Sequence, residues 1–470
     1  MDISKEIQIF NDLNINLDNL VNSTLDVFED CVLIINLNNR TKLNKYVTEA
    51  INKKAKLIIT SINCDIESEK VVKFENYEDV FNHVIKKMYP EYVDKNFFGL
   101  TGTNGKTTTG YYLNQLLGED SLFIGTTEDY LFKDITKEEH LTTPKIFNIF
   151  KLLRKKEYTH INNIVLEVSS HALDQNRLKG MKFLVSGFTN LSQDHFDYHD
   201  NIDNYFDAKK KLFNKNLSKQ YVFIDEDWGT RLNKEVNGES WSIGFKKEND
   251  MFVKEIKSSE SNTLVSFKID NHDYNVILPF IGPNCEMNYL LAVGMAHFSD
   301  TLSIDRILLE TVNIKNPKGR FEKFSYLDND VYVDYAHTPE AIDKAIEVVQ
   351  EKYEKIIIVF GAGGNRDSDK RVNMGKAANK ADQIIITNDN PRKEDPMTIA
   401  KEILEGVDLN KKVEIVLDRK AALKKGLDSL LGKSVLLVLG KGHESKQELN
   451  KGFVDFDDSV MISNLIKDMK

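Results

Sequence analysis

The sequence is poor in cysteine, and it contains no long apolar run. Cys31, Cys64 and Cys285 are its three cysteines in 470 residues, and their spacing matches no metal-ligand pattern, so a reducing compartment is expected. Nowhere do apolar residues continue for the roughly 18 positions that a membrane span requires. The first residues lack the basic start and apolar core of a signal peptide. These absences predict a cytoplasmic protein without membrane insertion.

A surplus of basic residues is missing as well. The chain has 63 Lys and Arg against 73 Asp and Glu, which gives a net charge of −10. Binding to nucleic acid relies on basic side chains that neutralise backbone phosphates, so the charge argues against a nucleic-acid partner. The hydrophobic share of 41% is that of an ordinary globular protein. We therefore expect small-molecule substrates and a chain of about two to four domains.

The most informative stretch is a glycine-rich loop, residues 99–110, which follows the apolar pair Phe97 and Phe98. Gly102 and Gly105 allow the backbone to turn with its N–H groups pointing inward, as a phosphate site requires. The ammonium group of Lys106 and the hydroxyl of the next residue, Thr107, suit terminal phosphates and Mg²⁺. The alternative is a surface turn rich in Gly and Thr. The strand before and the helix after favour a nucleoside triphosphate site.

The order of apolar runs and helical patterns predicts an α/β protein of three domains. We expect a small N-terminal α/β domain at 1–96, a central P-loop ATPase domain with a parallel sheet at 97–318, and a C-terminal Rossmann-like domain at 319–470. Within the central domain, residues 251–278 alternate apolar and polar side chains, which predicts antiparallel strands. The Pro- and Gly-containing stretch 316–319 is the expected hinge.

Two further clusters in the central domain carry candidate chemistry. Glu167 ends an apolar strand, where ligands of parallel sheets bind, so it is a candidate Mg²⁺ ligand; the alternative is a carboxylate that only caps the strand. His195 lies between two aspartates, and the alternative for it is a structural hydrogen-bonding role. By composition alone, the run Lys209–Lys211 is typical of a solvated helix face.

In the C-terminal domain, three polar loops each follow an apolar strand. They contain Arg366, Arg392 and Glu444. The loop at 361–366 lacks the third glycine of a dinucleotide fingerprint, so an NAD site is not expected. Two guanidinium groups and a carboxylate at one sheet edge suit a ligand with carboxylate and ammonium groups. An amino acid is the simplest candidate.

Taken together, the motifs resemble those of the Mur ligases, ATP-dependent ligases that build the peptide of bacterial cell-wall precursors. The resemblance covers residues 97–470 and keeps the family's order. Its motifs are Thr101–Thr108, Thr142–Pro144, Glu167–Arg177, Asp194–His199, Gly319–Glu322, Asp334–Pro339, Asp389–Arg392 and Gly440–Glu444.

The resemblance implies a reaction and a set of roles. It implies addition of meso-diaminopimelate to UDP-N-acetylmuramoyl-L-alanyl-D-glutamate, with Arg392 pairing with the distal carboxylate of the amino acid. It also implies that Lys209 is carbamylated by CO₂ and that Mg²⁺ is bound. The implied catalytic residues are Lys106, Glu167, His195 and Lys209, and the implied metal ligands are Thr107, Glu167, His195 and Lys209.

The binding residues that the resemblance implies fall into three groups. For ATP they are Gly102, Thr103, Asn104, Gly105, Lys106, Thr107, Thr108, Asn288, Arg320, Asp334 and His337. For the UDP-muramoyl dipeptide they are Thr142, Thr143, Ser169, Gln175 and Arg177. For the amino acid they are Arg366, Asp389, Asn390, Pro391, Arg392, Gly440 and Glu444.

The chain departs from the family pattern at three places, one of which is Leu141, where the family sometimes has an asparagine before Thr-Thr-Pro. Cys285 stands where the family has an asparagine that contacts adenine, and the first 95 residues lack the Asp-Ser-Arg uridine signature. Three alternatives therefore stay open: a lysine-adding ligase, a ligase like folylpolyglutamate synthase, and a non-catalytic nucleotide-binding scaffold. We expect a monomer.

Overall fold

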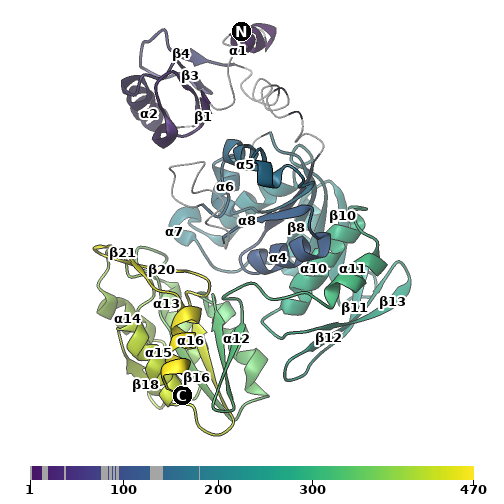
Figure 1. The fold of residues 1–470 in the computed structure, drawn as a ribbon, viewed down its shortest axis with the longest axis vertical. Helices are drawn as coiled ribbons and strands as arrows, with labels where there is room; N and C mark the ends of the chain where they lie inside the picture. Colours follow the sequence, from purple (N-terminus) through teal and green to yellow (C-terminus); the bar gives the residue numbers. More distant parts are fainter. Residues whose placement is uncertain are drawn as a thin grey trace.

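The computed structural model places three successive parts of the chain along its longest axis (Figure 1). The N-terminal part lies at one end, the central part in the middle, and the C-terminal part at the other end. Each part is built around its own sheet. The residues that the structure describes are 3–12, 19–35, 37, 39–75, 83, 87, 90, 95–126, 141–178 and 180–469.

The N-terminal part has a parallel four-stranded sheet in the order β1-β2-β3-β4. The side chain of Asn39 caps α2 by accepting a hydrogen bond from the backbone N–H of Lys42. Leu43, Val47 and Ala50 form the buried face of that helix. The elements are α1 (Ile3–Asp12), β1 (Leu20–Val21), β2 (Val32–Ile35), α2 (Arg40–Asn52), β3 (Leu57–Thr60) and β4 (Val71–Lys73).

The central part has a nine-stranded sheet in the order β13-β12-β11-β10-β9-β8-β5-β7-β6. Strands β5–β10 are parallel, and β11, β12 and β13 pair antiparallel, as the alternation at 251–278 predicted. The strands are β5 (Asn96–Thr101), β6 (Ser121–Ile124), β7 (Asn163–Glu167), β8 (Phe183–Phe188), β9 (Ser218–Ile224), β10 (Glu239–Gly244), β11 (Met251–Ser258), β12 (Thr263–Ile269) and β13 (His272–Leu278).

Helices of the central part cover its sheet, and α4 and α10 lie side by side (Figure 1). Nearly every residue of α10 is buried, because the helix packs against the sheet, α4 and α11. The helices are α4 (Lys106–Leu117), α5 (Ile146–Leu153), α6 (Ser170–Asp174), α7 (Phe196–His199), α8 (Ile202–Lys210), α9 (Asp227–Glu235), α10 (Cys285–Phe298) and α11 (Ile304–Thr311).

The C-terminal part has a six-stranded sheet in the order β14-β15-β19-β16-β17-β18, and all pairs except β14–β15 are parallel. The antiparallel edge strand β14 and the hairpin β20–β21 were not expected. The elements are β14 (Glu322–Tyr326), β15 (Asn329–Asp334), α12 (Pro339–Gln350), β16 (Lys355–Phe360), α13 (Lys370–Ala378), β17 (Gln383–Ile386), α14 (Pro396–Leu404), β18 (Lys412–Ile415), α15 (Arg419–Asp428), β19 (Ser434–Leu439), β20 (Lys446–Leu449), β21 (Gly452–Asp455) and α16 (Asp458–Asp468).

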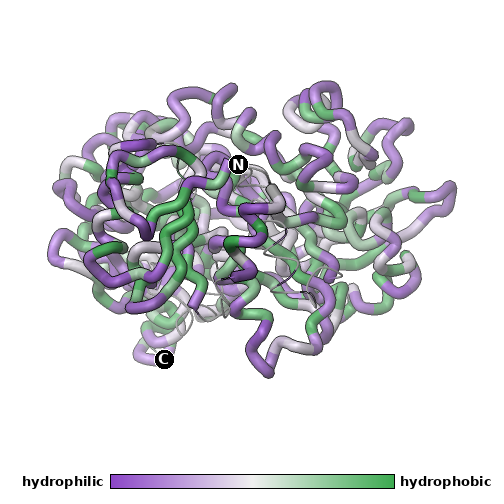
Figure 2. The backbone as a smooth tube through the Cα atoms, turned by 90° about the horizontal axis from the view of Figure 1, so that it is seen from above, coloured by the Kyte–Doolittle hydropathy of each residue, from purple (hydrophilic) through white to green (hydrophobic). Residues whose placement is uncertain are grey.

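The apolar residues are concentrated in the strands and in the inner faces of the helices. Figure 2 shows apolar strands in green, enclosed by hydrophilic loops in purple. Strands β16 and β19 are almost entirely apolar and buried, as expected for parallel strands covered on both faces. Across the described ranges, none of the helices combines the length and apolar character needed to cross a bilayer. The α/β fold expected from the sequence is confirmed, and the three large sheets lie within 20–73, 96–278 and 322–439.

Candidate active site

A cavity of about 310 Å³ lies where the central and C-terminal parts meet. The central part contributes the phosphate loop, meaning residues 102–108, together with side chains that follow β7 and β8. The C-terminal part contributes side chains that precede β14 or follow β15 and β16. The expected site residues that line the cavity are Thr103, Asn104, Gly105, Lys106, Thr107, Thr108, Thr142, Glu167, Ser169, His195, Asn288, Arg320, Asp334, His337 and Arg366.

The phosphate loop needs glycine at two positions. A Cβ atom on Gly102 would lie 1.8 Å from the Thr189 hydroxyl, and one on Gly105 would lie 2.3 Å from the Asn288 amide oxygen. Both glycines also have positive φ angles, 146° and 84°. The loop therefore packs directly against the segment after β8 and against α10, which fixes its shape.

The backbone N–H groups of the loop differ in what they face. Those of Thr103 and Asn104 donate to the backbone and side-chain oxygens of Asn190, each at 3.0 Å. The sequence predicted that the N–H groups of this loop point inward toward a phosphate, but these two point to Asn190 instead. The first turn of α4 follows directly, and N–H groups of a first turn have no acceptor within their own helix. The helix N-terminus, beginning at Lys106, is thus the end of this loop whose N–H groups are suited to bind an anion.

Two lysines converge on one carbonyl of the phosphate loop. The Nζ atoms of Lys106 and Lys209 donate to the carbonyl oxygen of Gly102, at 2.9 and 2.7 Å, and Lys106 also donates to Thr103 O at 2.9 Å. Burial lowers the pKa of Lys106. Burial, reinforced by the charge of Lys106, lowers the pKa of Lys209 well below its usual value. Lys209 is 1% exposed, so the prediction from composition that it lies on a solvated helix face is wrong. Its side chain does not line the cavity.

Glu167 ends β7 with its carboxylate turned into the cavity. It is 1% exposed, and it accepts hydrogen bonds from the backbone N–H and the hydroxyl of Thr126, each at 3.0 Å. A Cβ atom on Gly125 would lie 2.3 Å from this carboxylate. The segment after β6 therefore orients the carboxylate.

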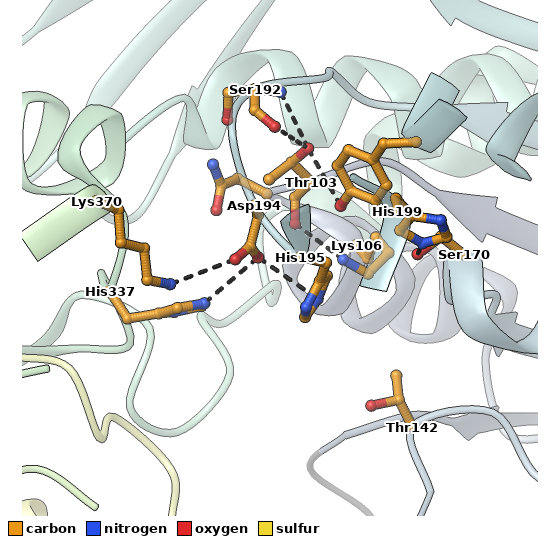
Figure 3. A network of polar contacts seen from close by, with 12 residues as sticks. Thr103, Lys106, Thr142, Ser170, Ser192, Asp194, His195, His199, His337 and Lys370 are labelled. Carbon is orange, nitrogen blue, oxygen red and sulfur yellow. Dashed lines mark hydrogen bonds and ion pairs between the residues drawn. The ribbon is translucent and has the colours of Figure 1, made fainter. Parts of the chain in front are cut away.

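Asp194 joins the two parts of the chain through its contacts with Lys370 and His337 (Figure 3). Its carboxylate lies 3.3 Å from Lys370 Nζ, 3.8 Å from His337 Nε2 and 3.5 Å from His195 Nε2. Burial raises the pKa of Asp194, but its contacts with His337, Lys370 and His195 outweigh burial and hold that pKa well below the usual range. Burial lowers the pKa of His195 to about 3. His195 is therefore neutral at physiological pH, with a ring nitrogen able to bind a cation.

Arg320 reaches from the C-terminal part to the phosphate loop. Its Nη2 donates to the hydroxyl of Thr107 at 3.1 Å, its guanidinium lies over the ring of Tyr335, and its buried Nε has no acceptor among the described residues. Asp334 accepts from the backbone N–H groups of Phe321 and Ala336, and burial raises the pKa of Asp334. Asp334 thus shapes the loop that carries Arg320. The Nε–H group of Arg320 is a donor that suits a bound anion.

The residues expected to bind the UDP-muramoyl dipeptide form two groups. Thr143 Oγ1 donates to Glu167 O at 2.8 Å and accepts from Ser169 N at 2.9 Å, which places Ser169 beside the cavity. Thr142 lines the cavity but lies apart from the Asp194 network (Figure 3). Arg177 donates to Gln175 Oε1 and to Thr143 O, and neither Arg177 nor Gln175 lines the cavity.

The residues expected to bind the amino acid are likewise divided. Arg366 is exposed and lines the cavity, whereas the loops 389–392 and 440–444 do not line it. These two loops contact each other: Asn390 Nδ2 donates to Glu444 Oε2 at 2.7 Å. Gly440 has φ 112°, and a Cβ atom there would lie 2.5 Å from Asp389 Oδ2. Pro391 is buried. The strand ends thus bring these loops together, as the sequence predicted.

Sequence reasoning missed four residues that organise the site. They are Thr126, which orients Glu167; Lys370, which contacts Asp194; Lys441, a fully buried lysine that donates to Glu444; and Glu448, which contacts Arg392. Lys441 lies within a motif already singled out, and this could have drawn attention to it. The other three carry no local signal, because each acts on a residue distant in sequence.

The oxygen donors of the cavity fit a hard cation. Among the residues that the structure describes, no three His, Cys, Asp or Glu side chains form a ready metal cluster. Mg²⁺, however, keeps several waters and phosphate oxygens and needs only one or two protein ligands. The buried carboxylate of Glu167 and the hydroxyl of Thr107 line the same cavity and meet that requirement.

Comparisons with known proteins agree with this arrangement. A model of the Mur ligase middle domain matches residues 100–296, and one of the Mur ligase glutamate ligase domain matches residues 319–442. The UDP-N-acetylmuramoyl-L-alanyl-D-glutamate--2,6-diaminopimelate ligase of Rickettsia montanensis is 35% identical, over 90% of each chain. Ligase 1 of that name from Clostridium acetobutylicum is 32% identical, over 100% of this chain and 98% of that protein.

Solved structures share the fold. One of a UDP-N-acetylmuramoyl-L-alanyl-D-glutamate--2,6-diaminopimelate ligase has a TM-score of 0.65 at 23% identity, and it covers 96% of this chain and 94% of that chain. Apart from Asn316, the residues that line the cavity lie within the segments that the family models match. The chain belongs to the Mur ligase family.

Proposed function

We propose that this protein is an ATP-dependent, ADP-forming ligase that adds meso-diaminopimelate to UDP-N-acetylmuramoyl-L-alanyl-D-glutamate in peptidoglycan precursor synthesis. The observation that carries the proposal is the shared cavity. It joins a phosphate loop in the central part to Arg320, His337 and Arg366 of the C-terminal part. Two relatives that align along nearly the whole chain carry the name of this activity. Each part corresponds to one proposed domain, at 1–96, 97–318 and 319–470.

In the first step, the γ-phosphoryl group of ATP passes to the side-chain carboxylate of D-glutamate, giving an acyl phosphate and ADP. The N-terminus of α4 and Lys106 bind the phosphates, and Arg320 binds them from the other side of the cavity. Thr107 and Glu167 would hold one Mg²⁺, and His195 with a carbamylated Lys209 a second. Magnesium would neutralise charge on the transferring group. Asn104, Asn288 and Thr108 complete the nucleotide site.

In the second step, the amine of diaminopimelate attacks the acyl phosphate carbonyl. The C–N bond forms, phosphate leaves with the C–O electron pair, and the amine loses a proton to solvent. Arg366 lies nearest the cavity and would bind one carboxylate of the amino acid. Arg392 would pair with the distal carboxylate, which lysine lacks, and Asn390 and Glu444 would bind the distal ammonium group. Thr142, Ser169 and Arg177 would position the dipeptide.

Carbamylation of Lys209 is supported by its surroundings. Only a neutral amine attacks CO₂, and burial beside Lys106 lowers the pKa of Lys209 well below its usual value. The product would be a carbamate anion beside the ammonium group of Lys106. ATP and a nucleotide-linked precursor are cytoplasmic metabolites, so we place the reaction in the cytoplasm. We also propose that the enzyme acts as a monomer.

The test is a panel of amino acids offered with ATP and the UDP-linked dipeptide, with ADP and the amide product both measured. We expect turnover with diaminopimelate and little with lysine. Preference for lysine would show a lysine-adding ligase, and turnover of a pteridine substrate would show a folylpolyglutamate synthase. Nucleotide binding without phosphate release in any mixture would show a scaffold and refute the proposal.

A further inference from the structure

Strand β20 lies along the loop that contains Arg392. Gln447 Nε2 donates to Asp389 O at 2.7 Å, and the backbone N–H of Glu448 donates to Asn390 Oδ1 at 2.9 Å. The N–H of Arg392 in turn donates to Glu448 O at 3.1 Å. Two consecutive residues of β20 therefore contact three of the four residues in the loop 389–392.

The side chain of Glu448 also holds the side chain of Arg392. The guanidinium Nε donates to Glu448 Oε2 at 2.7 Å, and its Nη1 donates to Gly364 O at 2.8 Å. Arg392 has a φ of 52°, a left-handed conformation that a non-glycine residue adopts only when its surroundings enforce it. Side chain and backbone are thus both fixed by Glu448.

This arrangement leaves one edge of the guanidinium available. In the described part of the chain, nothing accepts a hydrogen bond from Nη2 of Arg392, and Nη1 has a second hydrogen beyond the one given to Gly364. The edge formed by Nη1 and Nη2 can therefore bind a carboxylate with two parallel hydrogen bonds. Glu448 occupies the other edge through Nε.

We propose that Glu448 is a positioning residue for amino-acid selection: it orients the Arg392 guanidinium so that its free edge accepts the distal carboxylate of the substrate. This inference rests on the proposed function, because that function assigns the carboxylate to Arg392. Glu448 acts through Arg392 and touches no reacting atom. Its removal raises the KM for diaminopimelate and leaves the chemical step unchanged.

The test compares Glu448→Ala with Glu448→Gln in steady-state kinetics. For Glu448→Ala we expect the KM for diaminopimelate to rise about tenfold, because a misplaced binding group loses much of its effect. Its kcat and its KM for ATP stay within about twofold by the same reasoning, since the nucleotide end is untouched. Glu448→Gln keeps a carbonyl that accepts from Nε, so its KM stays near that of the wild type.

Two further variants separate positioning from loss of structure. Adding Glu448→Ala to Arg392→Ala has no further effect if Glu448 acts only through Arg392. Glu414→Ala is the matched control, because it removes another Glu–cation pair of the C-terminal part, that with Lys425, and it leaves all kinetic constants unchanged.

The outcomes distinguish this inference from the proposed function. A wild type that makes no product from diaminopimelate refutes the proposed function and the inference with it. An active wild type with an unchanged KM in Glu448→Ala overturns the inference alone. A fall in kcat with all KM values unchanged also overturns it, as does an additive loss in the double variant.

Discussion

The nucleotide half and the amino-acid half of the candidate site are built differently. In the nucleotide half, Lys106, Glu167 and His195 line one cavity, and each follows directly on a strand or loop recognisable in the sequence. In the amino-acid half, Arg392 and Glu444 lie outside that cavity and are held by β20 and by each other's loops. The first half is assembled by the central sheet, and the second depends on a hairpin added beyond the sheet.

This difference separates catalysis from selection. The phosphate loop packs against the segment after β8 and against α10 without space for a Cβ atom, so its geometry is rigid. The loop 389–392 is held instead by several hydrogen bonds from one added strand, β20, and the side chain of Arg392 within it is 23% exposed. Substitutions in the first half should therefore abolish turnover, and those in the second half should change which amino acid is used.

The largest effect is expected for Lys106→Ala. Lys106 is half-buried at the N-terminus of α4, and under the proposed function its loss removes the cation beside the transferring phosphoryl group. We expect kcat/KM to fall on the order of 10³–10⁵-fold, the range seen when a phosphoryl-stabilising cation is removed. A coupled ADP-release assay measures this, and thermal unfolding verifies the fold. Activity within tenfold of the wild type would show that phosphate transfer occurs elsewhere.

Lys209→Ala should have the next largest effect. If the residue carries a carbamate that takes part in charge stabilisation, kcat falls about 10²–10³-fold, as for loss of one preorganised electrostatic group. Lys210→Ala is the matched control, because the neighbouring lysine pairs with Asp207 and Glu235 at the surface. With ¹³C-bicarbonate, NMR should detect a carbamate in the wild type and in the Lys210 variant. Its presence in Lys209→Ala would contradict the assignment.

Arg392→Ala tests the selective half. Loss of the partner of a bound carboxylate costs about 2–3 kcal/mol, near the lower end of values for truncated charge pairs, because Arg392 is 23% exposed. That corresponds to a KM for diaminopimelate about 30- to 140-fold higher. The KM for ATP should not change. Equal rises in both KM values would show that the two halves are coupled, and the comparison drawn above would then fail.

The same comparison explains which features of the fold and of the candidate site could be predicted from the sequence. Apolar runs such as those of β16 and β19 predicted the C-terminal sheet, and strand ends predicted the loops at 366, 392 and 444, because these signals are local. Lys370 and Glu448 could not be found this way. Each acts on a residue far along the chain, and a single charged residue on a helix or hairpin resembles any solvated charge. The composition around Lys209 predicts an exposed side chain, and only the packing of the folded chain shows that it is buried.

The smallest effect is expected in the nucleotide half, at its one departure from the family pattern. Cys285 lines the cavity at the start of α10, and burial raises the pKa of its thiol well above the usual value, so a neutral thiol lines the proposed nucleotide site. A thiol is a weak hydrogen-bond donor and a weak acceptor, whereas an amide offers a strong donor and a strong acceptor. In Cys285→Asn we expect the KM for ATP to fall about fivefold, the equivalent of one hydrogen bond of about 1 kcal/mol.

Cys64→Ser is the control for this substitution, because Cys64 lies in the N-terminal part and its thiol donates to Ile66 O. Its KM values should equal those of the wild type. Initial rates over a range of ATP concentrations give the KM for ATP of each variant, and the same measurement with GTP shows whether the change is specific to adenine. If Cys285→Asn binds ATP no better, then adenine recognition comes from elsewhere in the cavity, and Glu340 and Lys344 of α12, which line the same cavity, become the residues to substitute next. The nucleotide half would then depend on the C-terminal part for its specificity as well as for Arg320.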